Sequence, residues 1–213
     1  MMFAFFAGLA AGLIHVFAGP DHLAAVTPLV VSSGQQPALN EIPSGEARRE
    51  RVEGWRTGLQ WGIGHTAGVV LIAALLLLLS DQLPLDAISS YSERIVGVAL
   101  IAVGAWGIWK ARQAPQPHTH AGASFAMGTL HGLAGSSHLF GVLPALAFSL
   151  QADAVLYLTG FGLGAMAGMS AFAAVVGVVS IRLGHNHPGR YRGFLYASSA
   201  VALVIGGFWL VGR

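Results

Sequence analysis

Six apolar runs occupy most of this chain, and they constrain its fold more than any other feature. They cover residues 3–31, 59–79, 95–109, 125–150, 154–181 and 194–211. Apolar residues make up 54% of the 213 residues and charged residues only 9%, far from the composition of an ordinary soluble domain. About six spans of ~20 residues with short loops use the whole length. We therefore predict a single integral membrane domain over residues 1–213.

Two of these runs carry the same histidine motif. HVFAGPDHL begins at His15 and HGLAGSSHL begins at His131, and both fit the frame H-x-x-A-G-x-x-H-L. An imidazole is costly to hold at bilayer depth unless it has a ligand or a partner, so each motif is a candidate functional site. The first run has no basic segment before its apolar part, and we read it as a span and not as a cleaved signal peptide.

The repeat extends beyond the histidines. GIGHTAG at 62–68 aligns with GLGAMAG at 162–168, and Tyr91 and Trp109 align with Tyr191 and Trp209, all at an offset of 100 residues. The histidine motifs lie 116 residues apart, so the first half carries 16 more residues, which fall in the polar loop at 32–53. Gly- and Ala-rich membrane helices can also look alike by chance. The ordered matches favour a duplication of three spans, over residues 1–112 and 113–213.

An odd number of spans in each half makes the second half enter the membrane from the opposite face. The predicted fold is thus an all-α membrane protein of six transmembrane helices, built as two inverted three-helix repeats. The first helix of each repeat carries a histidine motif. Many secondary transporters use this arrangement for alternating access.

The basic residues test this topology through the positive-inside rule. With six single crossings, nine basic residues fall on one side and two, Arg94 and Arg213, on the other; the nine are Arg48, Arg49, Arg51, Arg56, Lys110, Arg112, Arg182, Arg190 and Arg192. If the histidine segments were re-entrant hairpins, the split would be seven to four, a poorer fit. We expect six crossings of the cell inner (plasma) membrane, with both termini on the non-cytoplasmic side.

The first histidine motif requires a break in its helix. On an unbroken helix His15 and His22 would share a face but stand about 10.5 Å apart along the axis, too far to bind one ion. Gly19 and Pro20 lie between them, and these residue types permit a bend and free a backbone carbonyl. Asp21 then falls at the start of the second half-helix, where the dipole favours a carboxylate. It is the one carboxylate well inside an apolar run, and it supplies part of the charge that a divalent ion needs.

The candidate ligands form a nitrogen-rich set assisted by one carboxylate. Taken singly, each histidine is more simply explained by a hydrogen bond across a helix interface, and His65 could equally be a packing residue. Together the set suits Ni²⁺, Co²⁺, Cu²⁺ or Zn²⁺, and the chain has no cysteine to offer a thiolate. The predicted metal ligands are His15, Asp21, His22, His65, His131 and His138. The ion is expected as transported cargo, with no prosthetic group.

Four further histidines fall in loops on the basic side. His118 and His120 lie in PHTHAG, and His185 and His187 lie in GHNHPG. Such pairs are usually solvated, although short histidine tracts can hold metals transiently. Their side of the membrane suits a hand-off to a cytoplasmic metallochaperone. The formal net charge of +2 reflects topology, and we expect the bilayer and a metal ion as partners, with no nucleic acid.

Three segments of the chain are similar to motifs of a known transporter family. The segments GLIHVFAGPDHLAAV, WGIGHTAG and HGLAGSSHL resemble the UreH-type members of the nickel/cobalt transporter (NicO, NiCoT-related) superfamily, over essentially the whole chain. The resemblance implies metal recognition by His15, Asp21 and His22, with His131 and His138 in the later motif. It also implies nickel supply for maturation of metalloenzymes such as urease or hydrogenase. The His-x5-Asp-His spacing departs by one residue from the His-x4-Asp-His of the larger permeases, so their metal preference carries over only loosely.

Three other functions are considered besides metal uptake. A metal exporter of the same fold would use the same residues. A bis-histidine haem electron carrier would also place histidines on facing helices, and its colour would reveal it. An intramembrane metallohydrolase is disfavoured, because the chain has no H-E-x-x-H motif and no membrane-embedded glutamate, and we expect no enzymatic activity.

Overall fold

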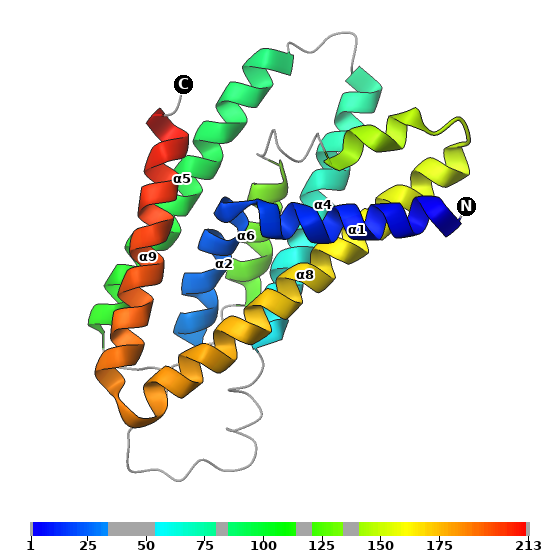
Figure 1. Ribbon diagram of the computed structural model, residues 1–213. Helices are drawn as coiled ribbons and strands as arrows, with labels where there is room; N and C mark the ends of the chain where they lie inside the picture. Colours follow the sequence, from blue (N-terminus) through cyan, green and yellow to red (C-terminus); the bar gives the residue numbers. More distant parts are fainter. Residues whose placement is uncertain (1, 34–53, 80–84, 114–120, 134–140, 212–213) are drawn as a thin grey trace.

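The computed structural model describes residues 2–33, 54–79, 85–113, 121–133 and 141–211, and every regular element in them is a helix (Figure 1). The elements in chain order are α1 (Met2–Ala18), α2 (Pro20–Ser33), α4 (Gly54–Leu79), α5 (Leu85–Arg112), α6 (Ala121–Leu133), the 3-10 helix η1 (Leu143–Ala147), α8 (Gln151–Asn186) and α9 (Pro188–Val211). The prediction of an all-helical chain is confirmed.

Three helices among the described residues are long and apolar enough to cross a membrane. They are the Arg94–Arg112 part of α5, the Gln151–Gly184 part of α8 and the Gly189–Val211 part of α9. The bent pair α1 and α2 makes a fourth candidate if it is taken as one broken span. Large apolar side chains such as Val155, Val204 and Phe208 point outward from these helices, as expected where lipid replaces water.

The first apolar run is broken where the sequence predicted. Residues 3–31 were expected as one span, but α1 ends at Ala18, α2 begins at Pro20, and the two helices are bent by 73°. The Gly19 amide donates to the carbonyl of His15 at 3.1 Å, and the His22 amide donates to the carbonyl of Gly19 at 3.1 Å. A Cβ on Gly19 would collide with the His22 ring and the Asp21 carboxylate, so this placement of the two side chains requires glycine at position 19.

The run at 125–150 also differs from the single helical span that was expected. Its described residues form the end of α6 and the 3-10 helix η1, in which Pro144 lies in the first turn. Residues 134–140, which connect these two elements, lie outside the described part of the chain. Proline suits the first turn of a helix but not its interior, which explains why no long helix runs through Pro144.

The helix pairings of the two halves match each other. Helix α1 packs along α8, where Gly12 lies against the backbone carbonyl of Phe161. Helix α6 packs along α4, where Gly128 lies against the carbonyl of Trp61. The two glycines are 116 residues apart and the two aromatic residues are 100 apart, the same offsets that align the sequence halves. The first helix of each half therefore packs on the second helix of the other half.

The directions of the helices follow from the same contacts. Gly8 and Gly12 of α1 meet Tyr157 and Phe161 of α8 in that order, so these helices run the same way. Gly64 and Gly68 of α4 likewise meet Phe125 and Thr129 of α6 in order.

Helices α4 and α8 run in opposite directions. Gly62 of α4 lies against Met166 of α8, and Thr66 of α4 lies against Gly162 of α8. Residue numbers therefore increase along α4 where they decrease along α8. Helix α1 shares the direction of α8, and α6 shares the direction of α4. It follows that α1 and α6, which carry the two histidine motifs, run in opposite directions.

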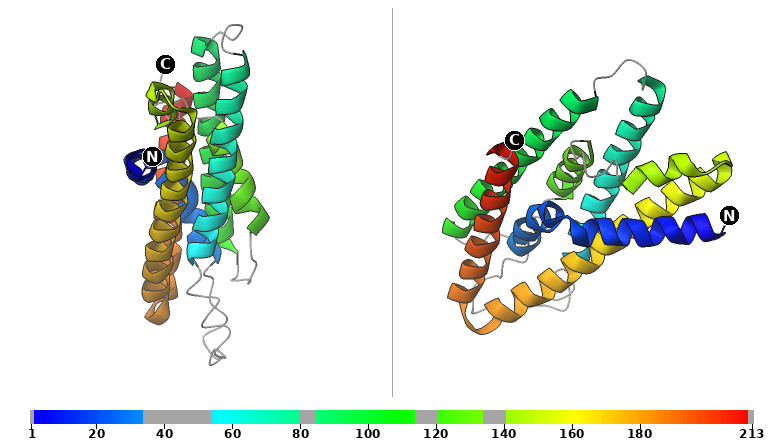
Figure 2. Two further views of the ribbon diagram at one scale, coloured as in Figure 1. Left: turned by 90° about the vertical axis from the view of Figure 1, so that its right-hand side faces the viewer. Right: turned by 45° about the horizontal axis from the view of Figure 1, so that its top comes forward.

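The described basic helix ends gather at one end of the molecule. Figure 1 shows the start of α4, the end of α5 and the α8–α9 junction together at the bottom, and the first of the two views in Figure 2 again places the start of α4 beside that junction. These segments carry Arg56, Lys110, Arg112, Arg182, Arg190 and Arg192. These six of the nine basic residues agree with the predicted charge asymmetry, while Arg48, Arg49 and Arg51 lie outside the described residues.

Candidate metal centre

Five of the six predicted ligands converge at the break between α1 and α2. His15 lies in the last turn of α1, and Asp21 and His22 lie in the first turn of α2. His65 comes from the middle of α4, and His131 comes from the last turn of α6. The exposed fraction is 4% for Asp21, 1% for His131 and 0% for both His22 and His65, while His15 is partly buried. The sixth predicted ligand, His138, lies outside the described residues.

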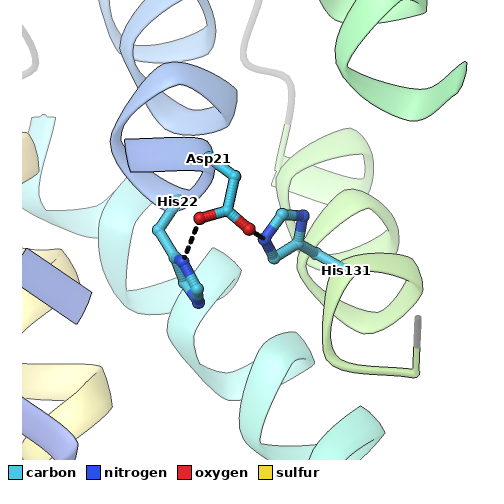
Figure 3. A network of polar contacts seen from close by, with 3 residues as sticks. All are labelled: Asp21, His22 and His131. Carbon is cyan, nitrogen blue, oxygen red and sulfur yellow. Dashed lines mark hydrogen bonds and ion pairs between the residues drawn. The ribbon is translucent and has the colours of Figure 1, made fainter. Parts of the chain in front are cut away.

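Asp21 joins two imidazoles from different halves of the chain (Figure 3). Its Oδ1 lies 3.1 Å from Nδ1 of His22, and its Oδ2 lies 3.1 Å from Nε2 of His131. A carboxylate only accepts hydrogen bonds, so both ring nitrogens donate to it. This use of both oxygens satisfies a buried charge that would otherwise be costly, and the N-terminus of α2 adds a favourable dipole.

His22 lies at the centre of the imidazole cluster. Its ring centroid is 4.7 Å from that of His15, 5.0 Å from that of His65 and 4.7 Å from that of His131. The His15 and His65 rings are stacked at 5.7 Å, whereas His65 and His131 lie farther apart at 6.0 Å. Three rings therefore surround that of His22, and the four do not form one even ring of ligands.

Two groups of three residues can each hold an ion. The imidazole position consists of His15, His22 and His65, and the carboxylate position consists of Asp21, His22 and His131. Within each group the ligand atoms all lie within 4.8 Å of one another. Ligands about 2.1 Å from an ion stand at most about 4.2 Å apart, so small side-chain movements would close either group on an ion.

Aromatic residues line the cluster on its two sides. Trp61 of α4 is fully buried and stacks on His65, with centroids 5.0 Å apart and an interplanar angle of 16°. It also contacts His22 at 5.6 Å and His131 at 5.3 Å. Phe161, the matching residue of the second half, contacts His15 at 5.4 Å. Trp61 and Phe161 thus give the cluster an apolar environment, in which charge interactions are stronger than in water.

Trp61 is the residue that sequence reasoning missed. It precedes His65 by four residues, one turn of helix, so both side chains lie on the same face of α4. The segment WGIGHTAG contained this signal, but only the histidine was selected as a candidate.

The loop histidines are not part of the cluster as far as they are described. His187 is exposed between α8 and α9. His118 and His120, and the side chain of His185, lie outside the described part of the structure. Their role as solvated or metal-holding residues stays a prediction.

Comparison with known proteins gives two plant relatives. The chain is 32% identical over 216 residues to "Chloroplast protein FOR GROWTH AND FERTILITY 2" of Arabidopsis thaliana, covering 93% of this chain and 54% of the relative. It is 31% identical over 222 residues to "Chloroplast protein FOR GROWTH AND FERTILITY 1" of the same plant, covering 93% of this chain and 56% of the relative. The chain thus spans about half the length of these relatives. No family model matches the chain, and no solved structure matches it.

These relatives correct one expectation. We expected the cell inner (plasma) membrane, with both termini on its non-cytoplasmic side, but both relatives are named as chloroplast proteins, which contradicts this expectation. The expectation was wrong because the positive-inside rule orients a chain within a membrane and does not identify the membrane. The resemblance to nickel/cobalt transporters stays a prediction, since the names of the relatives mention no metal.

Proposed function

We propose that this chain is a membrane transporter of a divalent transition-metal ion, with nickel or cobalt as the preferred cargo. One observation carries the proposal: four histidines and a carboxylate from four helices meet at a helix break inside an apolar bundle. Buried ionisable groups inside a membrane-spanning bundle are characteristic of ion pathways. Following the relatives, we propose that the membrane is that of a plastid.

The donor chemistry supports a transition metal over magnesium or calcium. The cluster offers imidazole nitrogens and one carboxylate, whereas magnesium and calcium prefer oxygen ligands. The chain contains no cysteine, so soft thiolate sites for Cu(I) or iron–sulfur clusters cannot form. Nickel, cobalt, copper(II) and zinc all suit such a set, and geometry decides among them.

An inverted repeat with six crossings would give this site its mechanism. The opposite directions of α1 and α6, and the exchanged packing of α1 on α8 and α6 on α4, support two halves related by a pseudo-twofold axis in the membrane plane. The ion would lie where the halves meet. Rocking of one half against the other would then expose it to each side in turn, with small residues such as Gly64, Gly68, Gly164 and Gly168 allowing close sliding contacts.

Flux measurements on the purified full chain in proteoliposomes test the proposal. Vesicles containing a metal-sensitive dye receive Ni²⁺, Co²⁺, Zn²⁺ or Mg²⁺ outside, and a second set is loaded with metal to follow efflux. We expect Ni²⁺ or Co²⁺ to cross and Mg²⁺ not to cross. A visible spectrum of the same protein checks for haem. No transition-metal flux in either direction, or a haem absorption band, would contradict the proposal.

A further inference from the structure

The metal cluster is organised around a single shared residue. His22 belongs to both the imidazole position and the carboxylate position, while the other members of each group differ. Its ring contacts His15, His65 and His131 at centroid distances of 4.7, 5.0 and 4.7 Å. An ion in either position can therefore have His22 as a ligand.

The two outer histidines are equivalent residues of the two halves. His15 and His131 are 116 residues apart, the offset of the histidine motifs, and they belong to helices that run in opposite directions. The imidazole position contains the first of them and the carboxylate position contains the second. The imidazole position thus uses residues of the first half alone, and the carboxylate position adds one residue of the second half.

The hydrogen bond to Asp21 determines which nitrogen of His22 can ligate. A neutral imidazole has one N–H and one nitrogen lone pair. In the structure Nδ1 donates to Asp21, so a neutral His22 has its lone pair on Nε2. Figure 3 shows that this second nitrogen lies on the edge of the ring turned away from Asp21. Nε2 is thus the nitrogen through which a neutral His22 that donates to Asp21 would ligate an ion.

Resting on the proposed transport of a metal ion, we propose that the ion passes between the two positions in a relay on His22. In the imidazole position the ion binds Nε2, and the proton stays on Nδ1, hydrogen-bonded to Asp21. In the carboxylate position the ion takes the place of the two protons donated to Asp21: it binds Nδ1 of His22, Nε2 of His131 and the carboxylate, and each ring then carries its proton on its other nitrogen. Both rings stay neutral, so the step requires no net proton. Because a neutral ring has one lone pair, the chain holds one ion at a time.

The two positions differ in charge. The carboxylate position includes Asp21, which compensates part of the charge of a divalent ion, whereas the imidazole position is made of neutral ligands. An ion therefore gains charge compensation as it moves toward His131. In the relay only one of the two positions contains a carboxylate. This agrees with the sequence, in which Ser137 of the second motif matches Asp21 of the first.

Binding stoichiometry of variants of the full chain tests the relay. His65→Ala disables the imidazole position and His131→Ala disables the carboxylate position, while His22→Ala disables both. The first change suits the helix, because Ala165 occupies the matching buried position of the second half. Glutamine replacements at positions 65 and 131 keep the side-chain volume if an alanine variant fails to fold. The probe is Ni²⁺ alone, followed by calorimetry on the purified protein, with Co²⁺ X-ray absorption to identify the ligands.

We expect one ion per wild-type chain. The His65 and His131 variants should each still bind one ion, weakened by at most about 10–100-fold, the range typical for loss of a residue outside the coordination shell. The oxygen ligand should persist in the His65 variant and be lost in the His131 variant. Both variants should lose transport, and His22→Ala should lose measurable binding.

Two results would overturn the relay. Two ions per wild-type chain, both of them lost in His22→Ala, would mean that His22 bridges them as an imidazolate. Loss of binding in the His65 and His131 variants as complete as in His22→Ala would mean one undivided site. In either case wild-type flux would remain, whereas failure of the proposed function would appear as a wild-type protein that neither binds nor transports the metal.

Discussion

Asp21 and His131 are joined by a 3.1 Å hydrogen bond, although 110 residues separate them in the sequence. One lies at the start of α2 and the other at the end of α6, so the bond connects the histidine motif of the first half to that of the second. Both side chains are almost completely buried. Movement of one half against the other must therefore stretch or break this contact.

Replacing Asp21 with asparagine should abolish metal transport. The substitution keeps the size of the side chain but removes the buried negative charge. It also replaces one acceptor oxygen with an NH2 donor, so that a donor faces the N–H of either His22 or His131 and one hydrogen bond is lost. Uptake of Ni²⁺ or Co²⁺ into proteoliposomes measures the effect. Asp153→Asn is the matched control, because Asp153 lies in the first turn of α8, eight residues before Phe161. Wild-type uptake by a normally expressed Asp21→Asn protein would contradict the role of Asp21 as a metal ligand in transport.

Metal binding should weaken as the pH falls. An imidazole must be neutral to ligate a metal, so protons compete with the ion, and the reference pKa of histidine is about 6.5. We expect the affinity for Ni²⁺ to be highest above pH 7 and to fall between about pH 7 and 5. Calorimetric titrations at several pH values measure this. An affinity that stays constant over this range would argue against histidine ligands.

Tryptophan fluorescence should report metal binding through Trp61. This ring stacks on His65 and contacts two other histidines of the cluster, so a bound paramagnetic Ni²⁺ or Co²⁺ ion should quench its emission. Trp61→Phe should remove most of the quenching, and Phe161 shows that phenylalanine fits the matching position. Trp55→Phe, which changes a partly exposed ring, serves as the control. Undiminished quenching in the Trp61 variant would place the ion elsewhere.

Gly128→Ala should destabilise the protein far more than Gly207→Ala. A Cβ at position 128 would collide with the backbone carbonyl of Trp61, whereas a Cβ at position 207 would meet nothing within 4 Å. Overpacking of this kind costs about 1–3 kcal/mol. Thermal unfolding in detergent compares the two variants at equal helix propensity. Equal midpoints would mean that α4 and α6 are not packed as closely as described here.

Cysteine labelling can test the six-crossing topology, because the chain has no cysteine of its own. Gly122 and Gly189 have open space around their Cα atoms and tolerate the change. With single crossings, cysteines at these two positions should react from the same side of the membrane, and one replacing the exposed Arg94 should react from the other. If 122 and 189 react from opposite sides, the segment between α6 and α8 is re-entrant.

Local chemistry made part of this structure predictable from the sequence. The break between α1 and α2 follows from Gly19 and Pro20, whose effects on a helix do not depend on distant residues. The offsets of 100 and 116 residues, found in the sequence, recur in the helix contacts of Gly12 with Phe161 and of Gly128 with Trp61. The convergence of five predicted ligands was also anticipated, because each stood out as a polar group in an apolar run.

Other features depend on contacts between distant segments. The sequence did not indicate that both oxygens of Asp21 are engaged by imidazoles, nor that the ligands divide into two groups at His22. Both follow from how α6 and α4 meet α2 in three dimensions. Trp61 was missed because an aromatic residue in an apolar helix gives no sign of what it will contact.

The exchange of first helices between the halves has a consequence for the synthesis of the protein. Helix α1 is made well before α8, but the surface that covers Gly8 and Gly12 belongs to α8, which begins at Gln151. During translation α1 must wait, with its small-residue face uncovered, until most of the chain has been made. His15 and Asp21 thus enter the bilayer long before His131 and α8 are available, and a nascent chain cannot assemble the complete metal site. The carboxylate position is thereby completed only after α6 of the second half has been made.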